Sequence, residues 1–515
     1  MTEILDVAVV GYGPVGAVLA NLLGRDGVRT AVFERDADIQ QLPRAVHFDH
    51  EIRRILQSIG LSEDVLTDTA PIEGYEFWNG KRETLFRFGI GQGVTHQGWR
   101  QDYMFHQPSL EKSLRDAVAR RDSVEVRLQH EVVGLEERDD HVVLHVHDMV
   151  AGETREIGAR YVVGCDGANS AIRKHAGLAL DDLEFDEGWL VVDAVIDKPR
   201  DALGLPIPAV QLCDPARPVS FIPVAGPYIR WEFMLRPGET KEEMLRRERV
   251  GELIAAWCDP RAVEVIRTAV YDFHALAAKR WNTRRVFLAG DSAHQMPPFL
   301  GQGMCSGLRD AANLTWKLRL VLSGGASEAI LASYQSERDP HVRALINIAI
   351  VLGRIICTQD AEAAAARDAD FLGRSEREPS PPEMPGCGPG VLQSGSAVAG
   401  KLGLQAAVRG GDGGLKLLDD VLGPGFALLM RAVPSRLSDT AERVRNDIAC
   451  RVVPIDATFD PSGDYERWLD RCGCDAILVR PDHVVFGTAS GANAASALLE
   501  ELGAALRGTG LQTSP

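Results

Sequence analysis

Three glycines near the start of the chain, with an acidic residue farther on, have the spacing of a dinucleotide site. Gly11, Gly13 and Gly16 follow a β-rich apolar run and open a helical pattern, and Glu34 ends the next β-rich run. In this context the first glycine makes a tight turn, the second lets the backbone approach a pyrophosphate, and the third lets the helix pack on the strand. Glu34 would then accept hydrogen bonds from ribose hydroxyl groups.

A second candidate polar group lies in Gly164-Cys165-Asp166-Gly167, which follows a predicted buried strand. Asp166 is placed to cap a helix that begins near Ser170, and it is equally placed to face a bound nucleotide. The pattern leaves both interpretations open.

A third stretch places an aspartate after a strand and a glycine-rich loop before a helix. Asp291 follows the predicted strand over 286–289 and is placed to accept a hydrogen bond from a cofactor hydroxyl. The loop over 297–303 precedes a helix predicted from about residue 305. Glycine turns that lead into a helix N-terminus would present several backbone N–H groups to one anionic group.

The composition narrows the class of protein. The 515 residues include 56 basic and 73 acidic ones, for a net charge of −17, which argues against nucleic acid or an anionic membrane as the main partner. No apolar run is long enough to span a bilayer, and the N-terminus reaches a core strand too soon for a targeting segment. With nine scattered cysteines, these features predict a cytoplasmic protein with reduced thiols.

The order of elements predicts an α/β protein with three parts. Residues 1–355 form the nucleotide-binding domain, and strands without intervening helices predict an inserted antiparallel sheet at about 73–106 and 183–280. Residues 356–390 are rich in Ala, Pro and Gly and are predicted to be a linker, and 391–515 form a smaller α/β domain. Within that domain, Cys472-Gly473-Cys474 lacks the redox Cys-x-x-Cys spacing, so these are expected to be ordinary thiols. No metal site is expected.

These three stretches, in this order, resemble the FAD signatures of the class A flavoprotein aromatic hydroxylases. The resemblance covers residues 1 to about 355 and implies a Rossmann-like FAD domain of the glutathione reductase type. The remainder is similar to the thioredoxin-like C-terminal domain of the phenol hydroxylase branch. Stretches at 43–45, 213–218 and 233–240 are most similar to 3-(3-hydroxyphenyl)propionate hydroxylases.

The resemblance implies a monooxygenase that uses NADH or NADPH, FAD and O2. Reduced flavin would form a C4a-hydroperoxide, which hydroxylates a phenol ortho to its hydroxyl group. The expected substrate is a phenol with a short carboxylated side chain. Alternatives that stay open are a polyketide- or antibiotic-modifying monooxygenase, an FAD oxidase without oxygen insertion, and a non-catalytic flavin protein. The C-terminal domain could also support a homodimer.

The resemblance also assigns residues to the site. Those expected around FAD are Gly11, Gly13, Pro14, Val15, Gly16, Glu34, Arg35, Arg44, Gln107, Asp166, Gly167, Asp291, Pro298, Gly301, Gln302, Gly303 and Met304. Among them, Asp291 would hold the ribityl chain, and Pro298, Gly301 and Gly303 would face the isoalloxazine. The substrate candidates are Gln211, Arg217 and Arg230. His294 is interpreted as a packing or hydrogen-bonding residue, and no phenol-activating residue is assigned.

Overall fold

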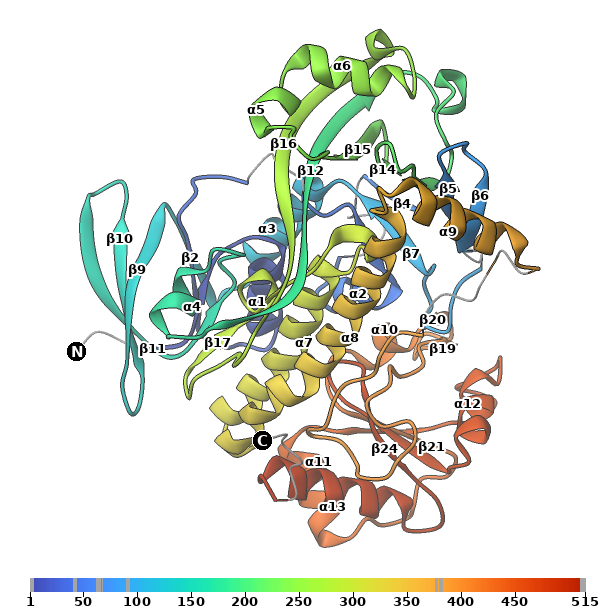
Figure 1. Cartoon of the computed structure of the whole chain (residues 1–515). Helices are drawn as coiled ribbons and strands as arrows, with labels where there is room; N and C mark the ends of the chain where they lie inside the picture. Colours follow the sequence, from blue (N-terminus) through green and yellow to red (C-terminus); the bar gives the residue numbers. More distant parts are fainter. Residues whose placement is uncertain are drawn as a thin grey trace.

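The computed structural model describes residues 4–39, 44–61, 66, 68–88, 93–375, 378 and 383–509. Pro43 and the pair Pro381-Pro382, which contributed to the sequence analysis, lie outside these residues. Figure 1 shows a parallel sheet with its helices, a second sheet that rises from it, and a C-terminal domain packed below the helices α7 and α8.

The first sheet carries the glycine motifs at the carboxyl ends of its strands. Its strands are β8 (Val124–Leu128), β2 (Thr30–Glu34), β1 (Leu5–Val10), β11 (Glu153–Gly164), β10 (Val142–Asp148) and β9 (His130–Glu137), in that order, with β17 (Val286–Leu288) paired to β11. The strands β8, β2, β1, β11 and β17 run parallel. β9 and β10 form an antiparallel extension. This is the predicted Rossmann-like domain.

Three helices bring distant parts of the chain onto this sheet. They are α1 (Pro14–Arg25), α3 (Gln107–Val118) and α7 (Gly303–Leu322). The predicted helix after the third motif is thus two residues longer at its start than expected. α1 and α7 are buried over most of their length, so their packing fixes the first motif against the third.

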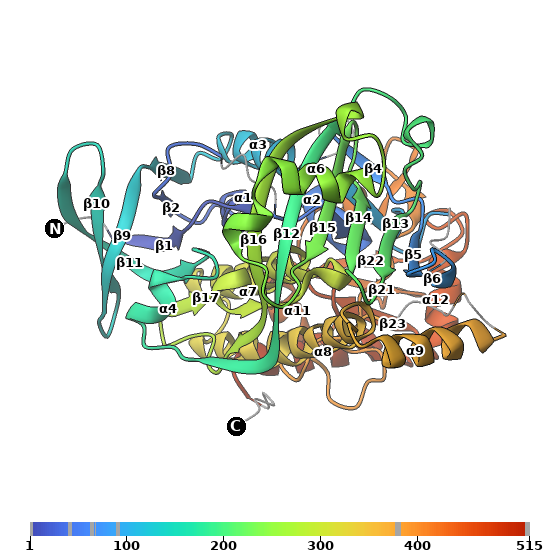
Figure 2. The same cartoon turned by 45° about the horizontal axis from the view of Figure 1, so that its top comes forward.

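The second sheet packs against the first domain. Its strands, in spatial order, are β18 (His294–Gln295), β16 (Val263–Ala278), β12 (Leu180–Ile196), β15 (Tyr228–Met234), β14 (Val219–Pro223), β13 (Ala209–Cys213), β5 (Tyr75–Asn79) and β6 (Thr84–Phe88). The pairings are antiparallel except that of β13 with β5, which is parallel. Figure 2 shows these strands side by side with α6 (Arg247–Ala255) across their outer face.

Alternation along β15 gives this sheet two different faces. Ile229, Trp231 and Phe233 pack in an outer core with α6. Met234 packs in the core of the first domain instead, so Arg230 and Glu232 lie on the face toward that domain. The antiparallel substrate sheet expected from the sequence is therefore present, with a polar inner face.

A small sheet is separate from the two larger ones. It consists of β3 (His47–Asp49), β7 (Asp102–Phe105) and β4 (Thr69–Pro71), and α2 (His50–Ser58) follows β3 directly. Asp49 caps α2 by accepting hydrogen bonds from the backbone N–H groups of Glu51 and Ile52.

The segment predicted to be a linker contains a helix, α9 (Ala361–Gly373), after α8 (Ser333–Ile356). Phe371 of α9 stacks on Phe86 of the second sheet with ring centroids 4.8 Å apart. This helix was not predicted because its sequence is rich in alanine and few of its residues are large and apolar. Within the described residues, no single helix is long and apolar enough to cross a membrane, although the bent pair Glu328–Ile356 and Ala361–Gly373 passes on length and composition alone.

The C-terminal domain has the predicted thioredoxin-like topology. Its sheet order is β22 (Arg451–Pro454), β21 (Ala427–Met430), β23 (Ala476–Val479) and β24 (Val485–Ala489). β21 and β22 are parallel and are joined through α11 (Asp439–Asp447), while β23 and β24 are antiparallel and are followed by α13 (Ala494–Leu506).

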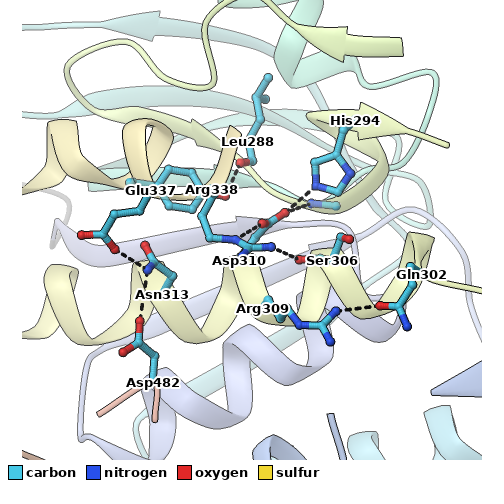
Figure 3. A network of polar contacts seen from close by, with 12 residues as sticks. Leu288, His294, Gln302, Ser306, Arg309, Asp310, Asn313, Glu337, Arg338 and Asp482 are labelled. Carbon is cyan, nitrogen blue, oxygen red and sulfur yellow. Dashed lines mark hydrogen bonds and ion pairs between the residues drawn. The ribbon is translucent and has the colours of Figure 1, made fainter. Parts of the chain in front are cut away.

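Buried ion pairs dock this domain onto α7 and α8. Glu337 lies 2.8 Å from Nη2 of Arg480 and 3.0 Å from Nζ of Lys317, and all three side chains are fully buried. Asn313 of α7 donates to both Glu337 and Asp482 (Figure 3). Burial would raise the pKa of Glu337, but the Arg480 guanidinium and the Lys317 ammonium hold it at about 2.

Candidate active site

The three glycines of the first motif occupy different environments. Gly11 has a φ of +99°, and a Cβ there would lie 2.4 Å from the carbonyl oxygen of Cys165. A Cβ on Gly16 would lie 2.0 Å from the carbonyl oxygen of Gly11. Around Gly13, by contrast, no heavy atom of the described residues comes within 4 Å of that position, and none of their side chains caps the N-terminus of α1. Gly13 therefore borders open space at an N-terminus that can bind a phosphate.

Glu34 is held at the end of β2 beside this turn. Its carboxylate accepts hydrogen bonds from the backbone N–H of Tyr12 at 2.7 Å and of Asp36 at 2.9 Å. A carboxylate has about four acceptor positions, so capacity for ribose hydroxyl groups remains. The neighbouring Arg35 has a side chain that is 65% exposed.

The third motif is seated directly on the first. A Cβ on Gly290 would lie 2.9 Å from Val15, and one on Gly307 would lie 2.6 Å from the same side chain. Asp310 of α7 fixes the turn by accepting from the backbone N–H of Gly290 at 3.1 Å and bonding His294 at 2.7 Å.

Figure 3 shows Asp310 at the centre of this network, with Arg338 on its other oxygen at 2.9 Å. Burial would raise the pKa of Asp310, but His294 and Arg338 hold it at about 2. The His294 side chain is thus used in a buried structural bond, as its interpretation from sequence anticipates.

Asp291 lies beyond this turn and has a different environment. None of the described residues hydrogen-bonds its carboxylate, and burial raises its pKa, an effect that Arg44 opposes. Arg44 lies on a loop whose backbone N–H groups at Arg44 and Ala45 donate to Gln107 at 2.7 and 2.8 Å. Gln107 therefore positions the Arg44 loop, and Asp291 retains its full acceptor capacity.

Asp166 behaves differently from Asp291. It accepts hydrogen bonds from the hydroxyls of Ser170 and Ser292 and from the backbone N–H groups of Ala171 and Ile172. Four donors fill the usual acceptor positions of a carboxylate. Of the two interpretations that the sequence leaves open, helix capping accounts for this side chain. Gly167, with a φ of +80°, borders open space beside it.

The loop from Pro298 to Gly303 ends at the N-terminus of α7. Gln302 donates to Asp49 at 3.0 Å and accepts from Arg309 at 2.9 Å, which fixes its side chain within the protein. Gly301 has a φ of +67°, and a Cβ there would lie 2.7 Å from the ring of His47. No side chain of the described residues caps α7, so its first N–H groups, at Gly303 and Met304, can face an anion.

His47 was not singled out from the sequence, yet it supports this loop. Its ring bonds the Gly301 carbonyl oxygen at 3.2 Å and Asp102 at 2.8 Å. Burial lowers the pKa of His47, but hydrogen bonds with Asp102 and Cys305 raise it well above its usual value. A protonated imidazole can donate to both partners at once.

Together these features fit bound FAD. Two uncapped helix N-termini, the open space at Gly13 and the unpartnered Asp291 offer donors and acceptors where the pyrophosphate, ribityl chain and ring of such a cofactor would need them. Pro14 lies in the first turn of α1, where its missing N–H costs no helical hydrogen bond.

The inner face of the second sheet carries a connected polar row opposite the loop. Ser220 donates to the side-chain oxygen of Gln211 at 2.6 Å, and Gln211 donates to the hydroxyl of Tyr75 at 2.7 Å. Tyr75 in turn donates to the carbonyl oxygen of Phe299 at 2.9 Å. The predicted substrate residue Gln211 is therefore linked to the loop predicted to face the isoalloxazine.

The two candidate arginines are both paired with carboxylates. Arg230, fully buried, bonds Asp193 at 2.7 Å and also donates to the carbonyl oxygen of Arg44 at 2.8 Å. Arg217 bonds Glu239 through both terminal nitrogens at a turn beside β14. Burial would raise the pKa of Glu239, but Arg217 and Arg236 hold it at about 2.

Sequence reasoning missed Tyr75 and Glu232. Glu232 is 5% exposed and sits two positions after Arg230 in an otherwise apolar strand. That spacing places both charges on one face of a strand, which is a signal that the sequence does contain.

The comparisons with known proteins agree with this geometry. Residues 4–349 match the family of FAD binding domains, and residues 400–505 match the HcaD C-terminal domain. A probable NADH-specific resorcinol 4-hydroxylase of Rhodococcus jostii (strain RHA1) is 37% identical, over 98% of this chain and 95% of its own length. The chain belongs to the class A FAD-dependent aromatic hydroxylases.

Other members of this flavoprotein family extend the comparison. A 3-(3-hydroxyphenyl)propionate/3-hydroxycinnamic acid hydroxylase of Burkholderia cenocepacia (strain HI2424) is 35% identical, over 93% of each chain. Among solved structures, aklavinone-11 hydroxylase in complex with FAD and aklavinone superposes with a TM-score of 0.81, covering 98% of this chain and 99% of its own at 23% identity. This similarity to aklavinone-11 hydroxylase shows that the two proteins share a fold.

Proposed function

We propose that this aromatic hydroxylase uses NADH and O2 to hydroxylate a monocyclic phenol ortho to its hydroxyl group. The observation that carries the proposal is the hydrogen bond between Tyr75 and Phe299, because it sets the polar inner face of the sheet directly against the loop assigned to the isoalloxazine. NADH as the reductant is supported by the name of the Rhodococcus relative.

FAD supplies the activation of O2 when it is bound and reduced. The N-terminus of α1 would bind the phosphates, Asp291 would accept hydrogen bonds from the ribityl hydroxyls, and the N-terminus of α7 would stabilise negative charge on the flavin ring. The sheet beside the loop would limit the access of water to the cofactor.

A carboxylated phenol is the second candidate substrate. It is supported by the name of the Burkholderia relative and by the resemblance of residues 213–218 and 233–240. Against it, Arg217 and Arg230, the cations expected to bind that carboxylate, are each occupied by an acidic side chain.

A screen of phenols tests the proposed function. The FAD-loaded enzyme is mixed with NADH and each phenol in air, and NADH loss, product mass and H2O2 are measured together. A catechol-type product formed in proportion to NADH supports hydroxylation. NADH oxidation that yields only H2O2 with every phenol would instead support an oxidase and contradict the proposal.

A further inference from the structure

Glu232 is a buried carboxylate on the inner face of the second sheet. It is 5% exposed, and none of the described residues donates to it. Its nearest cation is Arg230, whose Nη1 lies 3.7 Å away, beyond hydrogen-bond distance. That guanidinium is already committed to Asp193 and to the carbonyl oxygen of Arg44. A buried carboxylate in this condition is costly unless a ligand supplies the missing donor.

The position of Glu232 indicates where such a ligand would lie. On the inner face, Glu232 is directly opposite Ser220 on the next strand, and Ser220 is directly opposite Gln211. The hydroxyl of Ser220 is turned toward Gln211, and the side-chain amide of Gln211 toward Tyr75. Among the described residues, hydrogen bonds therefore connect the row from Ser220 to the Phe299 carbonyl, and Glu232 at its end takes part in none of them.

The charged and titratable groups around Glu232 affect its pKa. Burial raises its pKa to about 6; Arg230 and Arg267 lower the pKa, whereas Asp193 raises it. Burial raises the pKa of the Tyr75 phenol, and the charge of Glu232 raises it further. A carboxylate with a pKa near 6 can take a proton at neutral pH and release it again.

We propose that Glu232 accepts the hydroxyl proton of the phenolic substrate, and that the site consequently selects uncharged phenols over phenols that carry a carboxylate. This inference rests on the proposed function and names the base and the substrate class for that same site. A second negative charge on the inner face would face Glu232 and Asp193 while both nearby guanidinium groups are bound to Asp193.

The proton step balances within the established type of reaction. The O–H bond of the phenol breaks, its proton moves to a carboxylate oxygen of Glu232, and the electron pair left on oxygen increases the electron density at the ortho carbon. One oxygen atom of O2 forms a bond to that carbon, whose hydrogen leaves as a proton, and the other oxygen atom leaves as water. NADH supplies the two electrons and one hydrogen, the solvent supplies one proton for the water, and Glu232 returns the proton that it took to the oxygen of the product.

Binding measurements distinguish a role of Glu232 toward the substrate from a purely structural role. The oxidised, FAD-loaded enzyme is titrated calorimetrically at pH 8 with 1,3-dihydroxybenzene and with 3-(3-hydroxyphenyl)propionate. We expect the wild type to bind the uncharged phenol more tightly. Glu232→Gln should lose roughly tenfold or more of that affinity and gain affinity for the carboxylated phenol. Glu264→Gln, on an exposed position of β16 in the same sheet, should match the wild type.

The pH dependence of turnover provides a second readout. In the wild type, kcat/KM for the uncharged phenol should rise with pH through about 6 and then level. In Glu232→Gln that rise should be absent, with turnover reduced roughly a hundredfold or more, while FAD content stays unchanged. Glu232→Asp should recover part of the rate together with the rise.

Several outcomes would overturn the proposal. One is a wild-type preference for the carboxylated phenol; another is a Glu232→Gln variant with unchanged affinity and pH profile in an enzyme that does hydroxylate phenols. The latter leaves the proposed function intact and removes only the role of Glu232. A wild type that binds and hydroxylates neither phenol would remove both.

Discussion

The hydroxyl of Tyr75 donates a hydrogen bond to the carbonyl oxygen of Phe299 across 224 positions of sequence, at 2.9 Å. This bond joins the inner face of the second sheet to the loop that begins at Pro298. Because Gln211 bonds the same hydroxyl, the tyrosine couples a proposed substrate residue to the loop proposed to face the flavin.

Tyr75→Phe should reduce coupling between NADH consumption and hydroxylation. The change leaves the Phe299 carbonyl and the Gln211 amide without their partner, at a cost of about 1 kcal/mol in the free energy of unfolding. A more mobile loop around Phe299 would admit water to the flavin, so we expect more H2O2 per NADH consumed. The control is Tyr161→Phe, which loses a similar bond to Glu328 far from the loop. Equal coupling in both variants would contradict this role for Tyr75.

Substitutions of the glycines should separate folding from cofactor binding. Gly13→Ala should fold, because its φ of −72° suits alanine and the new methyl meets open space, but the methyl occupies room needed by the pyrophosphate. Gly16→Ala should fail to fold stably, since its Cβ would meet the Gly11 carbonyl at 2.0 Å. Thermal unfolding of the apoproteins and FAD titration distinguish the two effects. FAD affinity of Gly13→Ala equal to that of the wild type would refute the assignment.

Asp291→Ala should weaken FAD retention more than it slows the fully loaded enzyme. A lost hydrogen bond to a charged group costs about 1.5–3 kcal/mol, enough to give partly apo protein at ordinary concentrations. Flavin absorbance relative to protein concentration measures the occupancy. Asp197→Ala, at an exposed position, serves as the control. Unchanged occupancy in Asp291→Ala would count against its role.

Glu232→Gln should make the protein more stable at pH 8 and leave its stability at pH 4 nearly unchanged. The folded-state pKa of about 6 lies above the usual value of 4.5, so folding favours the protonated form. That contribution is fully present below pH 4.5 and is lost as pH rises through 6. Removing the charge should therefore gain about 2 kcal/mol at pH 8. Thermal unfolding at both pH values tests the sign, and an equal gain at pH 4 would be inconsistent with a titrating group.

Replacing both Cys472 and Cys474 with serine should leave hydroxylation intact. Burial raises the pKa of both thiols, to about 11 for Cys474, whereas reactive thiols have lowered values. Turnover with and without reductant is the measurement. A large loss, together with reductant-dependent activity of the unmodified enzyme alone, would restore a redox role.

Local patterns predicted the elements of this fold well, and long-range contacts account for what they missed. The glycine turn before α1 and the strand that ends at Glu34 follow from short, regular sequence. The helix α9 was missed because alanine gives no apolar stripe. Helix capping by Asp166 was one of two roles inferred from the sequence, since a cap is local, but the pairing of Arg217 with Glu239 and of Arg230 with Asp193 depends on long-range contacts. Glu232 was overlooked because its spacing from Arg230, although present in the sequence, gains meaning only when the neighbouring strands are known.

Because of the buried ion cluster of Glu337, Lys317 and Arg480, the C-terminal domain cannot simply be replaced by that of a relative. Lys317 and Glu337 lie on α7 and α8 of the first domain, whereas Arg480 lies in the C-terminal domain, so a chimera that inherits only one side would bury charge without compensation. Recombination between relatives at the junction near residue 390 should therefore give a stable protein only when the residues at these three positions come from the same parent. The cluster thus requires that the two domains carry matching buried charges.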